Sequence, residues 1–567
     1  MLFYTIELEW YFLFTGVIEE DKMNNLDYVS EVICVGMAIA TFLLNTGRGV
    51  KAIEVSKECL IFVNNEVLEK KKEQFVQLVS IAVYETIFMA YCLTSDYTNA
   101  IKYGRQLLDI YQNRGETGED EGILLLKLAM IYEKQFKYPE AGKLYEKAIN
   151  ITREIGDRKG ESAAYGNLGA VVSSLGEYDK AIEYLGKALA ITIEIRDRAG
   201  EASCYGELGI VFQALGEYHK AKEYIEKALT VRIEIGDRKG VLTNFVNLGI
   251  IFQSLGEYDK AKEYLEKALA IGIEINDRAE EASCYGNLGT VFHSLGEYGK
   301  AKEYLEKALA IRIEIGDKKG EAADCGNLGV SFQSLGECDK AVEYLERPLA
   351  IKKEIGHRKG EASCYGNLGT VFQHAYEYGR AKEHYEKALA ISSEIGDRKG
   401  ETADYINLGT KFLSRGEYEE AKENFDKALA ITVEIGYRAG EASCYGNLGY
   451  LFQSLGEYDK AKQYYLKGLV IRKEIGDRAG EVTDYLNLGS LFHFIGEPVV
   501  AEGYLKKALS ISQDIGNLDK EFACLCTLTT VKITQEKIQG AFEYLVLSME
   551  KSERLRAFLR DNDQFKV

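Results

Sequence analysis

The chain is poor in proline and has no long apolar stretch. It contains three prolines in 567 residues, and 46% of its residues are apolar, which excludes disordered low-complexity and collagen-like classes. Its two most apolar runs, residues 10–18 and 32–44, fall short of the roughly 18 residues that a membrane-spanning helix needs. We therefore expect buried helices in a soluble, cytoplasmic protein that has no membrane partner.

Clusters of positive charge are also missing. The chain carries 70 Lys and Arg against 89 Asp and Glu, giving a formal net charge of −19. No basic patch interrupts this mixed-charge surface, so the whole chain should repel phosphate backbones. Nucleic acid is therefore not an expected partner.

Signatures of catalysis and metal binding are absent as well. The six histidines occupy unrelated repeat positions, and no phosphate-binding loop of the G-x-x-x-x-G-K type occurs. The eleven cysteines lack paired C-x-x-C spacing, and four of them, Cys204, Cys284, Cys364 and Cys444, recur eighty residues apart. This spacing favours a duplicated small core residue over a disulfide framework or a zinc site. We expect a non-enzymatic protein without cofactor or metal.

The dominant feature that is present is a repeat of forty residues. Blocks follow one another without insertion from Glu121, starting at 121, 161, 201, 241, 281, 321, 361, 401, 441, 481 and 521. Residues 46–62 and 95–110 resemble the second half of a block, which predicts two degenerate copies beginning near residue 30. The expected organisation is a divergent helical region over 1–119, a regular array over 120–520, and a last repeat with a tail over 521–567.

Each block has the pattern of two amphipathic helices. In the block at 281, Tyr285, Leu288 and Phe292 form one apolar helical stripe, and a second stripe runs from Ala301 to Leu309. Gly296 stands where a helix can end in a left-handed residue. Asp317 is placed to cap the first helix of the following block. The pattern predicts a helical hairpin.

Stacking is then a structural requirement, because a single hairpin leaves one side of each stripe wet. The sequence predicts an all-α solenoid with two irregularities. Pro348 removes an amide donor inside a second helix and predicts a kink near 344–348. Tyr376 replaces the turn glycine of most blocks and predicts a different turn geometry between 373 and 380.

The order of these residues resembles a known family. The spacing aromatic-x-x-Leu-Gly-x-x-aromatic at 285–292, followed by Ala301, Leu305 and Ala308, is similar to the tetratricopeptide repeat, here lengthened to forty residues. The resemblance implies a right-handed superhelical solenoid of antiparallel helix pairs. The units are most similar to the tetratricopeptide repeat protein 28-like group and more distantly to the LGN/Pins adaptors.

In the first of these groups, such arrays commonly run into a caspase-like CHAT domain. Residues 553–567 resemble the entry to that domain. An alternative expectation is therefore a regulatory arm of a CHAT-domain protein whose catalytic part is missing from this chain.

A row of asparagines is the main candidate binding site. The face of the first helix opposite its apolar stripe carries Ser283, Asn287, Thr290 and Ser294, and the resemblance implies that this face lines a concave groove. The Asn287 position is Asn in eight of nine blocks and Glu207 in the other: Asn167, Asn247, Asn287, Asn327, Asn367, Asn407, Asn447 and Asn487. A carboxamide can both donate to and accept from the backbone of an extended peptide. LGN-type arrays use asparagines at this position in that way, whereas simple duplication of solvated asparagines is the plainer explanation.

A second polar row lies six residues further along the same helices: Gln213, Gln253, His293, Gln333, Gln373 and Gln453. Together the two rows predict a scaffold or adaptor that binds extended or partly helical segments of partner proteins. A self-associating rod, in which terminal blocks stack between molecules, is a further hypothesis.

Overall fold

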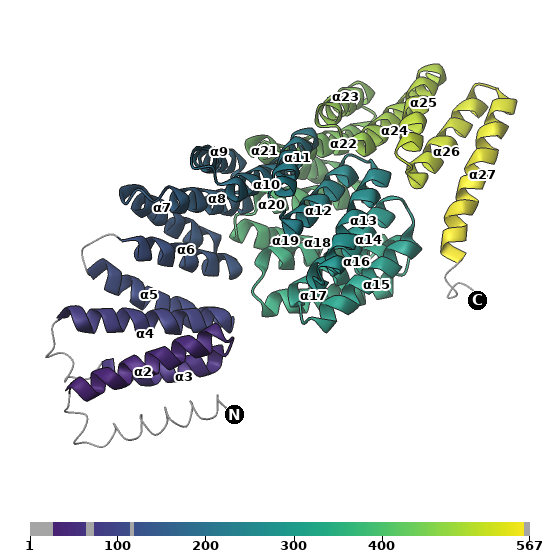
Figure 1. Ribbon diagram of the computed structural model, residues 1–567. Coiled ribbons are helices and arrows are strands. Elements are labelled where there is room, and N and C mark those ends of the chain that lie inside the picture. The colour runs from purple at the N-terminus through teal and green to yellow at the C-terminus, as the bar shows by residue number, and fades with distance from the viewer. Residues whose placement is uncertain (1–25, 64–72, 114–117, 561–567) are drawn as a thin grey trace. The chain divides into compact units, whose positions relative to one another are not determined.

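The computed structural model describes residues 26–63, 73–113 and 118–560, and this part of the chain contains helices and no strand. Consecutive helices form antiparallel hairpins (Figure 1). The helices are α2 (Leu26–Asn45), α3 (Gly49–Val63), α4 (Glu73–Leu93), α5 (Tyr97–Asn113), α6 (Glu119–Lys134), α7 (Tyr138–Glu154), α8 (Arg158–Ser174), α9 (Tyr178–Glu194), α10 (Arg198–Leu215), α11 (Tyr218–Glu234), α12 (Arg238–Ser254), α13 (Tyr258–Glu274), α14 (Arg278–Ser294), α15 (Tyr298–Glu314), α16 (Lys318–Ser334), α17 (Cys338–Glu354), α18 (Arg358–His374), α19 (Tyr378–Glu394), α20 (Arg398–Ser414), α21 (Tyr418–Glu434), α22 (Arg438–Ser454), α23 (Tyr458–Ile475), α24 (Arg478–Phe494), α25 (Pro498–Asp514), α26 (Leu518–Thr534) and α27 (Ile538–Arg560).

The predicted helical hairpins are confirmed, and two further helix pairs, α2–α3 and α4–α5, precede the regular blocks. Residues 32–44 lie within α2, and the two segments that resembled half-blocks lie within α2–α3 and α4–α5. The apolar run at 10–18 lies outside the described residues. No helix in the described ranges is both long and apolar enough to cross a bilayer.

The turns follow the predicted punctuation. Gly296 has a left-handed φ of +80°, and the following Glu297 N–H donates to the Phe292 carbonyl at 2.9 Å. Asp317 caps α16, because its Oδ1 accepts from the Gly320 N–H at 2.9 Å. The backbone turn bond recurs in successive blocks, whereas α18, α20 and α22 lack the side-chain cap.

The prediction of a different turn at Tyr376 is wrong. Tyr376 adopts φ +61°, the left-handed conformation of the glycines that it replaces. Glu377 N–H donates to the Phe372 carbonyl at 2.8 Å, which reproduces the hydrogen bond of the Gly296 turn. The flanking helices fix the turn, and the tyrosine accepts a conformation that is unfavourable for a residue with a Cβ.

Pro348 lies inside α17, which runs without a break from Cys338 to Glu354. The proline is buried among the core-facing residues of this helix. Its missing N–H leaves the carbonyl of Tyr344, four residues earlier, without its usual helical partner.

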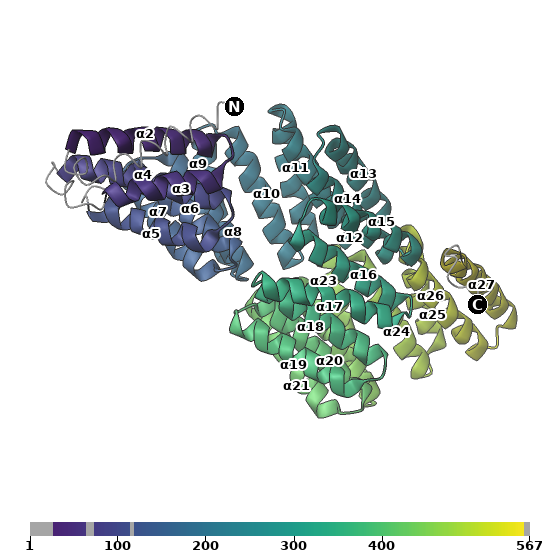
Figure 2. The same ribbon diagram turned by 90° about the horizontal axis from the view of Figure 1, so that it is seen from below.

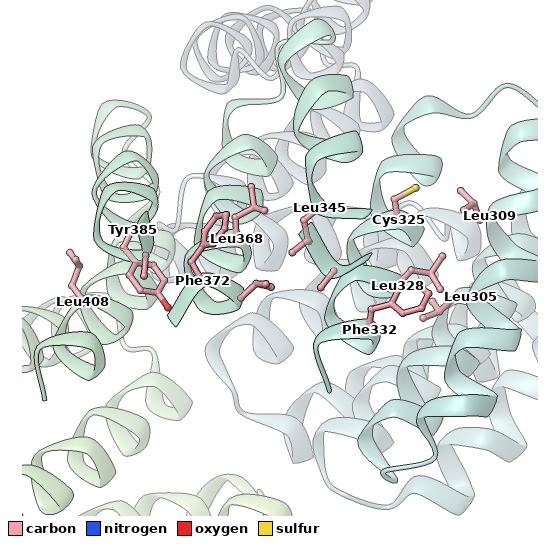
Figure 3. Packing of buried hydrophobic residues seen from close by; sticks show 13 residues of the cluster. Leu305, Leu309, Cys325, Leu328, Phe332, Leu345, Leu368, Phe372, Tyr385 and Leu408 are labelled. Carbon is pink, nitrogen blue, oxygen red and sulfur yellow. The ribbon is translucent and has the colours of Figure 1, made fainter. Parts of the chain in front are cut away.

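The chain divides into two compact units, residues 1–171 and 172–567. In the second unit the apolar stripes join into a continuous core, as stacking requires. Figure 3 shows this core from Leu305 on α15 through Leu345 on α17 to Leu408 on α20. Glycine permits the close packing, since a Cβ at Gly289 would lie 2.7 Å from the Leu305 side chain.

Within residues 172–567 the solenoid coils back onto itself, so that later hairpins lie beside earlier ones (Figures 1 and 2). The Tyr298 hydroxyl donates to Asp519 Oδ2 at 2.8 Å, and a Cβ at Gly216 would lie 2.7 Å from the Ala439 Cβ. We call this the coil contact; it joins residues 214–219, 256–258 and 294–298 to residues 399, 436–439, 476–479 and 515–519.

Candidate functional site

The turn residue of each hairpin gives every first helix a common register. This residue has positive φ and separates the two helices, as Gly296, Ser95, Gly47 and Phe136 do. Counting back from Gly296, the residues opposite the core stripe stand 13, 10, 9, 6, 3 and 2 positions earlier. We call this set of positions the groove face. The asparagine row stands nine residues before the turn residue.

The asparagines of the groove face are all partly exposed. Asn167, Asn247, Asn287, Asn327, Asn367, Asn407, Asn447 and Asn487 each have intermediate exposure. Two of them bond to their own helix, because Asn287 Nδ2 donates to the Ser283 carbonyl at 2.9 Å and Asn447 Nδ2 donates to the Ser443 carbonyl at 3.0 Å. The other six carboxamides form no hydrogen bond within the described part of the chain. None of the eight carboxamide oxygens accepts a hydrogen bond from the described part of the chain.

The side chains of the second row form more hydrogen bonds within the chain than the asparagines do. Gln253 Nε2 donates to Ser294 Oγ at 2.9 Å on the next first helix, and His293 Nε2 lies 3.0 Å from Ser334 Oγ in the same arrangement. Gln373 and Gln453 each accept a hydrogen bond from a buried tyrosine of their own hairpin. Gln213 and Gln333 have no such bond among the described residues. The row therefore contributes to contacts between hairpins as well as to the surface.

The first three hairpins place the groove face around a concave pocket that sequence reasoning missed. It has a volume of about 560 Å³ and is lined by α2, α4 and α6: Met37, Ala38, Thr41, Leu44, Ala82, Glu85, Thr86, Met89 and Lys127. Every one of these residues stands at a groove-face position counted from Gly47, Ser95 or Phe136. The usable signal was the turn residue, which aligns degenerate hairpins even where the forty-residue spacing fails.

The hairpin geometry agrees with a family comparison. A family model described as tetratricopeptide repeat matches residues 81–154, 120–194, 160–234, 240–314, 322–394 and 401–474, which is more than half of the chain. The chain belongs to the tetratricopeptide repeat family. Among curated proteins, none matches this tetratricopeptide repeat protein significantly.

Three solved structures are similar to this tetratricopeptide repeat protein. BtubC from P. vanneervenii is 21% identical, with 40% of this chain and 90% of that chain covered and a TM-score of 0.33. Apo RapI is 20% identical, with 48% and 98% covered and a TM-score of 0.38. A Rap protein complexed with competence and sporulation factor is 17% identical, with 64% and 99% covered and a TM-score of 0.43. At these TM-scores the likeness carries no information about a ligand.

The recurring cysteines of this tetratricopeptide repeat protein are buried. Burial raises the pKa of Cys284 and of Cys444 to about 12, which keeps both thiols protonated and unreactive. Within the described residues, no group of three or more His, Cys, Asp or Glu side chains is arranged to hold a metal ion. The four cysteines that recur in the sequence are buried core residues, as predicted.

Buried acids between hairpins were not predicted. Asp324, Asp404 and Asp484 stand at the repeat position of the recurring cysteines, and each is at most 5% exposed. Each faces a polar residue twelve positions earlier on the preceding second helix: Arg312 at 3.7 Å, Ser392 at 2.7 Å and Arg472 at 2.9 Å. The signal in the sequence was the joint variation of these two positions. These pairs lie inside the stack and link hairpins.

Proposed function

We propose that this protein is a non-catalytic scaffold whose groove face binds extended segments of partner proteins. Membership of the tetratricopeptide repeat family supports a role in binding other proteins. The observation that carries the finer proposal is the row of asparagines. Six of the eight carboxamides are partly exposed and lack a hydrogen-bond partner in the described part of the chain.

The carboxamides suit the backbone of a guest better than its side chains. A row with one side chain in each hairpin can donate to carbonyl groups and accept from N–H groups that every peptide has. The neighbouring position, six residues before each turn residue, varies from Thr290 to Tyr450. Variable side chains beside a row that is Asn in eight of nine blocks would then select the guest sequence.

Three asparagines without internal bonds provide the test. A peptide that binds the full chain is first selected from a peptide array. We expect Asn327→Ala, Asn367→Ala and Asn407→Ala together to weaken the binding of this peptide. Since each net hydrogen bond contributes ~1 kcal/mol, the loss should be roughly a hundredfold in Kd. Fluorescence anisotropy would measure it, and the melting temperature should stay nearly unchanged.

Asn424 provides the matched control. It is partly exposed on the second helix α21, where its Nδ2 donates to the Glu420 carbonyl at 2.7 Å. Asn424→Ala should leave the affinity unchanged. Equal affinity of the triple variant and the original protein would overturn the asparagine proposal.

Four finer expectations stay predictions. They are the similarity to the tetratricopeptide repeat protein 28-like group and to LGN/Pins, the cytoplasmic location, self-association through terminal repeats, and the CHAT-domain alternative. The last rests on residues 553–567, of which 561–567 lie outside the described residues.

A further inference from the structure

The pocket in residues 1–171 differs in chemistry from the asparagine row. It is lined by the first helices α2, α4 and α6 of three successive hairpins. At the position of the asparagine row these helices carry Ala38, Thr86 and Lys127. A guest seated here would meet Met, Leu and Ala side chains together with Lys127 and Glu85, where the later hairpins present carboxamides.

Methionines are concentrated on this surface. The chain has six methionines, and three of them, Met37, Met89 and Met130, stand at groove-face positions of these first helices. Met37, Leu44 and Met89 line the pocket and are partly exposed, while Met130 is 47% exposed. Unbranched thioether side chains adapt to irregular apolar partners, so this surface suits a bulky aliphatic or aromatic side chain.

Lys127 gives the pocket its polarity. Its Nζ lies 3.6 Å from Met89 Sδ, a weak acceptor. Among the described residues, no carboxylate lies within ion-pairing distance of this ammonium group. At the same register position, the other described hairpins carry Ala, Thr, Asn or Glu, so the cation is particular to this pocket.

We propose that this pocket binds an acidic amphipathic peptide segment. A bulky apolar side chain of the guest packs against Met37, Leu44 and Met89, and a neighbouring Asp or Glu pairs with Lys127. Burial of the apolar side chain contributes most of the affinity, and the ion pair sets the charge preference. This site is separate from the asparagine row and does not depend on it.

Glu85 has the opposite effect to Lys127 on the charge preference of the pocket. It lines the same pocket from α4, is exposed, and has no ion-pair partner among the described residues. Its carboxylate repels an acidic guest weakly, because solvent screens an exposed charge. Removing this charge should therefore strengthen binding, in contrast to a change at Lys127.

The methionines themselves report on occupancy. The full chain is labelled with ¹³C-methyl methionine, its signals are assigned by single Met→Leu variants, and a short synthetic peptide with one Phe flanked by Asp residues is added. We expect the Met37 and Met89 methyl signals to shift. Met549 provides an internal control, since it is 58% exposed but lies on α27. Equal shifts at Met549, or no shift at Met37 and Met89, would overturn the proposal.

Charge variants test the ion pair. Lys127→Glu should weaken the affinity for the acidic peptide by at least roughly tenfold, and a peptide with Lys in place of Asp should recover that loss. Glu85→Gln should increase the affinity for the acidic peptide by up to about threefold. Lys147→Glu, on the outer helix α7 where the lysine is exposed, provides the matched charge control and should change nothing. Unaltered affinity in Lys127→Glu would contradict the proposed pairing.

The asparagine variants keep the two proposals distinguishable. A protein carrying Asn327→Ala, Asn367→Ala and Asn407→Ala should still show the Met37 and Met89 shifts with the Phe-Asp peptide. Loss of these shifts in that variant would mean that the pocket is no separate site.

Discussion

One buried repeat position between the hairpins alternates between Cys and Asp in successive blocks. Cys284, Asp324, Cys364 and Asp404 follow one another at one repeat position, and all are buried. Asp404 accepts a hydrogen bond from Ser392 Oγ at 2.7 Å and has no ion pair among the described residues. A buried carboxyl group with a single neutral partner is costly to ionise.

Asp404 should therefore make stability depend on pH. Burial raises the pKa of Asp404 to about 7, above the value of about 3.9 in an unfolded chain. Between these values the folded state binds more protons than the unfolded state, so stability falls as pH rises through this window. Asp404→Asn should flatten the decline and raise stability by ~1–3 kcal/mol at pH 8, with little effect near pH 4.

Melting temperatures of the full chain between pH 4 and 8 would measure this effect. Asn is compatible with the site, because Asn244 occupies the same repeat position and is 1% exposed. Asp514→Asn provides an exposed control on α25, where the carboxylate pairs with Arg478 on the surface. Identical pH profiles for Asp404→Asn and the original protein would contradict the proposed ionisation.

At the scale of the element, the sequence was sufficient for the hairpins and insufficient for two details. The spacing of Tyr285, Leu288 and Phe292 predicted α14, and Asp317 predicted the start of α16. The turn at Tyr376 could not be predicted, since local preference disfavours left-handed tyrosine while the flanking helices enforce it. The bonds within the second row, such as Gln253 to Ser294, depend on the packing of neighbouring first helices and have no sequence signature.

Pro348 makes α17 the helix that a single substitution should improve most. Most other blocks carry Ala at this position, and the proline removes one helical hydrogen bond inside an unbroken helix. Pro348→Ala should stabilise the helix by ~1–3 kcal/mol and slow amide exchange in residues 338–354. Hydrogen exchange with mass spectrometry would detect it. Pro498→Ala, at the first turn of α25, should bring no gain, because that amide is free of a helical partner in any case.

At the scale of the whole second unit, the coil contact could not be predicted from the sequence. Leu255 and Leu455 occupy one repeat position, yet Leu255 is 2% exposed and Leu455 is 40% exposed. The difference arises because later hairpins cover the earlier turn and leave the later one open. Pitch is the sum of small rotations at every hairpin interface, and no single block of sequence encodes that sum.

Ala439 provides a way to open the coil. Its Cβ packs against the backbone of Gly216, and nearby Lys399 Nζ donates to the Ala214 carbonyl at 3.2 Å. Ala439→Glu would force a larger, charged side chain into this close approach, where it has too little space. The later hairpins should then separate from the earlier ones within residues 172–567. We expect a larger radius of gyration of the full chain by small-angle X-ray scattering and faster amide exchange at residues 214–219.

Ala199 stands at the same repeat position as Ala439 but is exposed, so that Ala199→Glu adds the same charge without touching the coil contact. This variant should scatter like the original protein. Because each hairpin is held by its immediate neighbours, neither variant should lose helical content, and circular dichroism would show whether that holds. An unchanged scattering curve for Ala439→Glu, with the helices intact, would mean that stacking between adjacent hairpins alone fixes the pitch and that the coil contact merely follows from it.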